Sequence, residues 1–245
     1  MDSTGGSSHL ARRRERRPLS EEVAAHVRSM IFSGALRAGE FVRLDRVAEE
    51  LDVSATPVRE GLQALRGEGF LSFEPRRGFV VAPLSPDDVQ DLFLVQADIS
   101  GELAARATAV VTAEWIAELR EMQRMLGEAI TEDRNQDVVD LNREIHRQIH
   151  RRTRAPKLAW LLGVTVRFAP EPLFLAIEGW KRASLHDHDA VIDALEAGDP
   201  ERVRTAMREH VLNAGELLAG HLRSLAGAPP REEPPEGGDP AAAHG

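Results

Sequence analysis

Residues 44–66 constrain the fold more than any other part of the chain, because two short helical patterns meet there across a tight connection. Apolar residues at helical spacing run from Leu44 to Leu51. Ser54 is then placed to cap a second helix, and Pro57 falls within its first turn, where a missing N–H costs nothing. The spacing therefore predicts two helices joined by a turn.

The predicted second helix has two faces of different character. Its apolar stripe consists of Val58, Leu62 and Leu65. Thr56 and Arg59 lie towards the opposite side, where they are available to phosphates and base edges. A second helix whose N-terminal turn enters the major groove is the arrangement of a helix-turn-helix. The alternative is an ordinary helical hairpin with a solvated arginine.

A β-hairpin is predicted after this helix. Residues 71–73 and 79–81 have the composition of short strands and flank a turn at residues 75–78. The turn presents Arg76 and Arg77 towards the phosphate backbone or the minor groove, as the wing of a winged helix does. A first helix over residues 19–33 completes a small DNA-binding unit.

These landmarks resemble the winged helix-turn-helix of the GntR family of bacterial transcription regulators over residues 19–82. The matching runs are Leu36-Arg37-Ala38-Gly39, residues 44–51, residues 53–62 and Gly67-Glu68-Gly69-Phe70. The resemblance implies that Thr56, Arg59 and the wing glycine Gly78 contact DNA. The family usually has Arg in place of Ala55, so one contact is either missing or moved to Arg43 or Arg46. The full predicted contact set is Arg43, Arg46, Ser54, Thr56, Arg59, Arg76, Arg77 and Gly78.

From residue 86 to about 224 the apolar residues recur at helical spacing in successive stripes. Residues 85–88 are a strong helix start, and a stripe from Leu158 to Phe168 is interrupted by Pro170 and Pro172. Antiparallel neighbours joined by short loops form a helical bundle. We therefore expect a mainly α protein, with a winged helix-turn-helix followed by an all-helical bundle that binds an effector and forms the dimer.

The net charge of −9 is unevenly divided along the chain. Residues 1–82 hold 13 Arg, no Lys and 12 acidic side chains, a net of +1, so the remainder carries −10. This division suits a DNA-reading unit joined to an acidic domain with another task. We expect residues 1–18 to be a disordered basic arm, either phosphate-binding or merely solvated, and residues 225–245 to be a disordered tail.

The chain has no Cys, so it can form neither disulfides nor thiolate metal sites. No apolar run approaches the length of a membrane span, and the N-terminus lacks the apolar segment of a signal peptide. We therefore expect a cytoplasmic protein with no membrane partner.

Three of the nine His fall at core-facing positions on three different predicted helices, namely His146, His188 and His210. Asn142 lies one helical repeat before His146, so both side chains point the same way. Three imidazoles and one oxygen are a suitable ligand set for a divalent ion such as Zn²⁺ or Ni²⁺. The alternative is a group of hydrogen-bonded core histidines.

The second half of the chain resembles the FCD effector-binding domain, which defines the FadR-type subfamily of GntR regulators. The resemblance spans residues 86–222 and rests on residues 142–146, residues 188–194 with Gly198-Asp199, and residues 207–210. Metal-binding members use one Asp or Asn and three His, which implies Asn142, His146, His188 and His210 as ligands here. Asn142 is a neutral donor, so the site has one negative charge fewer than an Asp version. His150 and His186 either compete with the ligands or lie beside them, or else they are exposed.

An effector site is implied by the same resemblance. Many relatives have Arg and Glu where this chain has Gln96 and Ser100. An Arg there would help to bind an effector carboxylate, so Gln96 indicates a different or less acidic ligand. Arg106 and Arg167 are candidate replacements, or else surface or ion-paired residues.

Together these features predict a ligand-responsive regulator that binds a palindromic double-stranded DNA operator as a homodimer. We expect a repressor, as most relatives are, with a small organic acid bound near the metal. One alternative is a metal sensor, in which the ion itself is the signal. Another is a three-His metal enzyme, but no HExxH motif is present and Asn142 cannot act as a general base. We therefore expect no enzyme activity.

Overall fold

The computed structural model describes residues 18–226, which form two compact units that divide between Pro83 and Leu84. Residues 1–17 of the predicted basic arm and residues 227–245 of the predicted tail lie outside the described residues. The predicted tail begins two residues too early, because residues 225–226 belong to the last helix. No helix in the described part of the chain is both long and apolar enough to cross a membrane.

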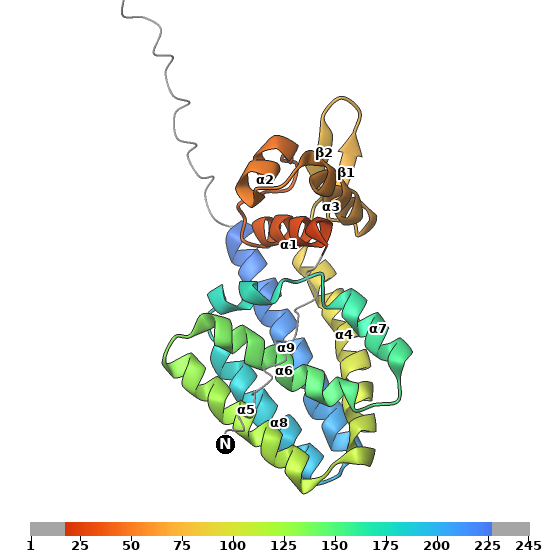
Figure 1. Ribbon diagram of the computed structural model, residues 1–245, viewed down its shortest axis with the longest axis vertical. Helices are drawn as coiled ribbons and strands as arrows, with labels where there is room; N and C mark the ends of the chain where they lie inside the picture. Colours follow the sequence, from red (N-terminus) through yellow and green to blue (C-terminus); the bar gives the residue numbers. More distant parts are fainter. Residues whose placement is uncertain (1–17, 227–245) are drawn as a thin grey trace, which may run out of the picture. The chain divides into compact units, whose positions relative to one another are not determined.

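The first unit is a winged helix-turn-helix (Figure 1). Its elements are α1 (Leu19–Phe32), α2 (Leu44–Leu51), α3 (Ala55–Gly67), β1 (Leu71–Glu74) and β2 (Gly78–Val81). The strands are antiparallel, with Leu71 opposite Val81 and Glu74 opposite Gly78. The helices and the hairpin predicted for this unit are therefore confirmed.

A single left-handed residue makes the turn between α2 and α3. Asp52 has φ 52° and ψ 48°, and its N–H bonds back to carbonyls in the last turn of α2. Ser54 occupies the N-cap position of α3, as predicted, but its side chain makes no capping hydrogen bond. The Ser54 side chain is instead exposed at the start of α3, beside Thr56.

Helices α1 and α3 pack closely because one of them has a glycine at the contact. A Cβ added to Gly61 of α3 would lie 2.7 Å from the Ser20 carbonyl oxygen and 2.7 Å from Val23 Cγ1. Val23 itself is fully buried, as are Val58 and Leu62 of α3. The apolar stripe predicted for the second helix therefore faces α1.

Gly61→Ala is expected to destabilise the first unit by about 1–3 kcal/mol, because the added methyl group must push α1 away. Gly67→Ala is the matched control, since a Cβ at this position of the same helix meets no atom within 4 Å. All three Trp lie in the second unit, so calorimetry should follow the unfolding. Equal unfolding temperatures for the two variants would contradict the close contact.

The second unit is helical over its described residues (Figure 1). Its helices are α4 (Pro86–Ala107), α5 (Ala113–Thr131), α6 (Asn135–Arg151), α7 (Pro156–Thr165), α8 (Trp180–Glu196) and α9 (Pro200–Ala226), with short 3₁₀ turns η1 (Thr108–Val110) and η2 (Glu171–Ala176). The helix start predicted at Ser85 is confirmed, because Ser85 and Asp88 form a reciprocal capping box. Helix α9 packs against both α4 and α8, and α5 packs against α6 and α8.

The predicted helix from Leu158 to Phe168 is wrong at its C-terminal end. Helix α7 ends at Thr165, and Pro170 and Pro172 fall at the start of η2. A proline disfavours helical backbone at the residue before it, so the helix cannot continue through Pro170. The last carbonyls of α7 are therefore left without helical partners. The Thr165 carbonyl instead accepts hydrogen bonds from the Phe168 N–H at 3.1 Å and from Gln96 Nε2 at 3.0 Å.

Two glycines allow α4 and α9 to approach each other. A Cβ on Gly215 of α9 would lie 2.6 Å from Phe93 Cβ, and a Cβ on Gly101 of α4 would lie 2.9 Å from the Arg204 carbonyl oxygen. Each helix therefore has a notch that the other fills, and the two contacts lie eight residues apart in α4, from Phe93 to Gly101, and 11 residues apart in α9, from Arg204 to Gly215. Two such contacts fix how far one helix can slide along the other.

Candidate metal centre and nucleic-acid interface

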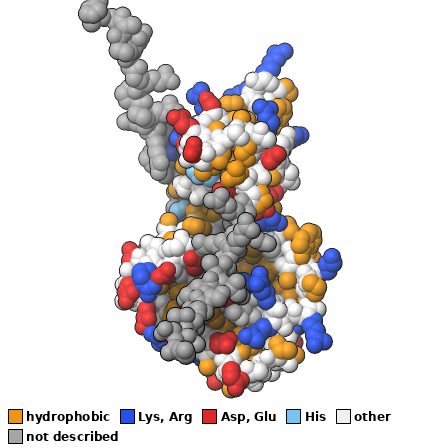
Figure 2. Space-filling view, in the orientation of Figure 1, with side chains coloured by type: hydrophobic (Ala, Val, Ile, Leu, Met, Phe, Trp, Pro, Cys, Tyr) orange, Lys and Arg blue, Asp and Glu red, His pale blue; other side chains and the backbone are white. Residues whose placement is uncertain are grey.

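The predicted DNA-contacting residues lie at the surface of the first unit. Seven of the eight are exposed, and Gly78 is half-buried. Thr56 and Arg59 lie on α3 away from its buried stripe, and Arg side chains project from the tip of the hairpin in Figure 2. A helix with an exposed polar face next to a basic hairpin is what groove and backbone contacts require.

The arginines of this surface differ in how they are held. Arg46 Nε lies 2.8 Å from Glu50 Oε1, and Arg77 Nη1 lies 3.1 Å from Glu74 Oε2. Arg59 makes no hydrogen bond or ion pair with any residue between 18 and 226, so no ion pair must break before it binds a phosphate or a base. Gly78 has φ 88°, and a Cβ there would lie 3.0 Å from Phe41 Cε2. Backbone conformation and packing therefore favour glycine at this position, apart from any contact with DNA.

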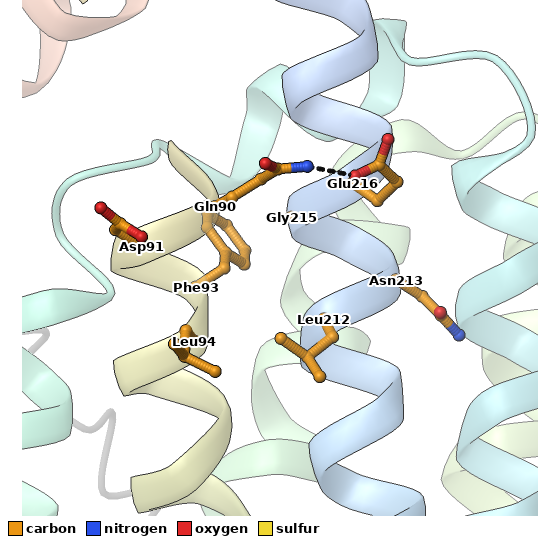
Figure 3. A pocket seen from close by; sticks show the side chains of 8 residues that line it. All are labelled: Gln90, Asp91, Phe93, Leu94, Leu212, Asn213, Gly215 and Glu216. Atoms are coloured by element: carbon orange, nitrogen blue, oxygen red, sulfur yellow. Dashed lines mark hydrogen bonds between the residues drawn. The ribbon is translucent and has the colours of Figure 1, made fainter. Parts of the chain in front are cut away.

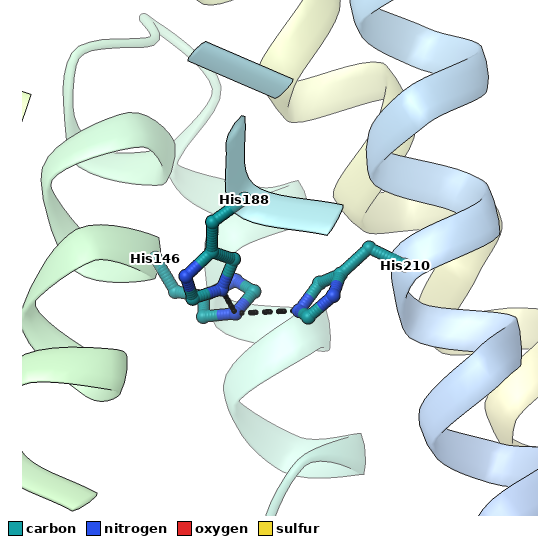
Figure 4. Close-up of side chains that lie close together, drawn as sticks. All are labelled: His146, His188 and His210. Carbon is teal, nitrogen blue, oxygen red and sulfur yellow. Dashed lines mark hydrogen bonds between the residues drawn. The ribbon is translucent and has the colours of Figure 1, made fainter. Parts of the chain in front are cut away.

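The three predicted histidines meet inside the second unit (Figure 4), from α6, α8 and α9. His146 Nε2 lies 3.3 Å from His188 Nε2 and 3.1 Å from His210 Nε2. The ligand nitrogens of the three all lie within 4.8 Å of one another. Nitrogens bound to one zinc ion at about 2.0–2.1 Å lie about 3.3 Å apart in a tetrahedral shell, so the observed spacing fits a single ion.

The protonation state of the cluster also fits a metal. Burial, reinforced by the neighbouring imidazoles, lowers the pKa of His146 and of His188 well below the usual range. A neutral imidazole keeps the lone pair that a metal ligand needs. The Nδ1 atoms of His188 and His210 are buried without a hydrogen-bond partner among the described residues, so the group is not satisfied by hydrogen bonding alone.

Asn142, the predicted oxygen ligand, is held by a residue that the sequence did not indicate. Its Oδ1 accepts a hydrogen bond from Ser184 Oγ at 3.1 Å, and Ser184 is buried. Ser184 precedes His188 by four residues, as Asn142 precedes His146, so α6 and α8 meet in two successive contacts. This shared spacing is the signal that could have revealed Ser184. The role of Asn142 as a ligand stays a prediction.

His150 and His186 have different surroundings. His186 is exposed, whereas His150 is half-buried and its ring centroid lies 5.8 Å from that of His146. The interpretation of His150 as an exposed histidine is therefore wrong, because its position one turn after His146 gives it the same inward face. Burial, with a smaller effect of His210, lowers the pKa of His150 to about 4. Its Nε2 is buried without a hydrogen-bond partner within the described residues.

The three residues predicted to bind an effector lie in different environments. Gln96 is buried, like Ser100, and its amide is engaged by the Thr165 carbonyl. Arg106 is exposed and its Nε lies 2.6 Å from Glu102 Oε1. Arg167 is exposed beyond the end of α7. Gln96 thus has a structural task that its sequence position did not reveal, and the effector-binding role of all three stays a prediction.

A separate groove of about 370 Å³ lies between α4 and α9 (Figure 3). Its lining residues are Gln90, Asp91, Phe93, Leu94, Leu212, Asn213, Gly215 and Glu216. Gln90 Nε2 donates a hydrogen bond of 2.5 Å to Glu216 Oε2 and so joins the two helices. The groove includes none of the predicted effector or metal residues.

Known proteins share both units of this chain. Residues 19–81 match the bacterial regulatory proteins of the gntR family, and residues 91–213 match the FCD domain. The HTH-type transcriptional regulator McbR of Escherichia coli is 26% identical over 214 residues, which cover 85% of this chain and 93% of that protein. The probable D-xylose utilization operon transcriptional repressor of Paenarthrobacter nicotinovorans is 26% identical over 215 residues, covering 86% and 91%.

The fold is shared as well. The solved structure of E. coli McbR/YncC has a TM-score of 0.60 at 24% sequence identity, and the match covers 86% of this chain and 98% of that one. The two matched segments correspond to the winged helix-turn-helix and to the helical unit described above. These relatives are transcription regulators and not enzymes, which confirms the predicted class. The chain belongs to the GntR family of bacterial transcription regulators, with an FCD domain as its second unit.

Proposed function

We propose that this regulator represses transcription by binding a palindromic operator as a homodimer, and that a small organic acid bound near a divalent ion in the FCD unit releases it. The observation that carries the proposal is the convergence of three histidine Nε2 atoms inside the unit that follows the DNA-binding unit. A ligand can shift a regulator between two states only if it binds them with different affinities. A metal-anchored site inside the helical unit supplies such a ligand-binding position.

The proposed ligands of the ion are Asn142, His146, His188 and His210, with Zn²⁺ as the first candidate and Ni²⁺ as another. Imidazole nitrogens suit both ions. An ion held there would supply coordination positions for carboxylate oxygens, which is why the effector class is an organic acid. The side chains that surround His146 and His188 limit access of water and favour the neutral form of these two rings.

The proposed homodimer follows from how little DNA one α3 helix can read. One recognition helix contacts one half-site, whereas two copies related by a two-fold axis read two inverted half-sites. The test is a selection in which the full-length protein captures fragments of the genome that encodes it, and the bound fragments are sequenced. We expect enrichment of fragments with two inverted half-sites. A single, non-repeated half-site would contradict the dimer, and no enrichment would contradict sequence-specific binding.

The same operator separates the organic acid from the metal as the signal. Metal-free protein and zinc-loaded protein are titrated onto the operator, each with and without a series of small carboxylates. We expect a carboxylate to weaken operator binding by the zinc-loaded protein. A change on adding zinc alone, with no effect of any carboxylate, would instead identify the ion as the signal.

A further inference from the structure

A carboxylate lies behind one of the three histidines. Asp187 Oδ2 is 3.5 Å from His210 Nδ1, the ring nitrogen that does not face His146. The side chains of His210 and Asp187 are only 6% and 13% exposed. Asn213, three residues after His210 on α9, donates its Nδ2 hydrogen to the same Asp187 oxygen at 3.0 Å. Asp187 of α8 therefore contacts both His210 and Asn213 of α9, beside the histidine cluster.

We propose that Asp187 is a positioning residue for His210, and that Asn213 fixes Asp187 in that task. Asp187 holds the Nδ1–H of His210, so that the Nε2 lone pair of the same ring faces the ion. This inference rests on the metal site proposed above.

The position of the proton on His210 determines which ring nitrogen can bind the ion. A neutral imidazole carries a single proton, so a ring that binds metal through Nε2 must carry that proton on Nδ1. An acceptor at Nδ1 fixes the tautomer and the ring orientation and makes the ligand more basic. The 3.5 Å separation is longer than an ordinary N–H···O hydrogen bond of about 2.9 Å. No other described residue competes with Asp187, because none lies within hydrogen-bond distance of His210 Nδ1.

Asp187 lies between the ring that it would orient and a side chain that fixes it. Its Oδ2 accepts a hydrogen bond from Asn213 Nδ2 at 3.0 Å and lies 3.5 Å from His210 Nδ1. A carboxylate in this position can accept from both side chains.

The same three side chains could serve merely to join α8 to α9, and metal affinity distinguishes the two roles. The affinity of the full-length protein for Zn²⁺ is measured by competition with a chromophoric chelator, and thermal unfolding is measured with and without zinc. Asp187→Asn keeps the shape of the side chain and removes its charge. Asp189→Asn is the matched control, since Asp189 is exposed on the same helix and faces Gln123 and Arg120.

We expect Asp187→Asn to weaken zinc binding by about 10–100-fold, and Asp189→Asn to leave it unchanged. Asn213→Ala, which keeps the carboxylate and removes its clamp, is expected to weaken zinc binding less. If Asp187→Asn does not fold, the zinc affinity of Asn213→Ala tests the inference instead. Equal zinc affinity in wild type and the Asp187 variant, with an unfolding temperature lowered equally with and without zinc, would show a joining role and overturn the inference. A wild type that binds no zinc would overturn the metal site itself.

Discussion

Arg59→Ala is expected to weaken specific operator binding severely while leaving both units folded. Arg59 is exposed on α3 and makes no polar contact with the described residues, so its truncation removes no native interaction. An arginine contact to a base edge is worth about 1–3 kcal/mol, and a two-fold dimer would lose it twice. The expected loss of affinity is therefore roughly 30-fold to 10⁴-fold.

The measurement is fluorescence anisotropy on an operator obtained by genomic selection, at one fixed salt concentration because phosphate contacts depend on salt. Arg124→Ala is the control, since Arg124 is an exposed arginine of α5 that is ion-paired with Glu121 and Glu128. It should bind the operator as the wild type does. Unchanged affinity of the Arg59 variant would exclude α3 as the helix that reads the operator.

His146→Ala is expected to empty the metal site. His146 Nε2 lies within 3.3 Å of both other Nε2 atoms, so its loss leaves only two imidazoles at the site. Two nitrogens and one amide oxygen fall short of the four ligands typical of a stable zinc site. Elemental mass spectrometry of the dialysed protein should find about one divalent ion per chain in the wild type and almost none in the variant.

His186→Ala is the control for this measurement, because His186 is exposed on α8 and lies outside the three-histidine cluster. It should retain the ion. Equal metal contents in the His146 variant and the wild type would contradict the site. Metal in neither would leave the DNA-binding assignment intact and make the histidines a polar pocket, whose ligand must be found without the clue of chelation.

The sequence predicted those parts of the fold that depend on local signals. Helix periodicity and the N-cap position of Ser54 predicted the helix-turn-helix, and Ser85 correctly marked the start of α4. The inward-facing positions of His146, His188 and His210 could be predicted as well, because each lies three or four places from an apolar core residue and so shares its face. The structure then brings the three rings together.

What the sequence did not predict depends on neighbours distant in the chain. Gln96 binds the carbonyl of Thr165, 69 residues later, and Ser184 binds Asn142, 42 residues earlier. Asp187 follows no periodic pattern, and its contact with His210 exists only because α8 and α9 pack together. Periodicity identifies which side chains face inward, but not which helix each of them meets.

The two glycine contacts between α4 and α9 have a mechanical consequence. With Phe93 seated over Gly215 and the Arg204 backbone over Gly101, neither helix can ratchet past the other without a steric clash. We therefore expect α4 and α9 to move together. His210 moves with them, because it lies on α9 between the two contacts. A tilt of α9 at the histidine cluster would accordingly carry α4 with it, the helix that four residues of the chain separate from the end of β2.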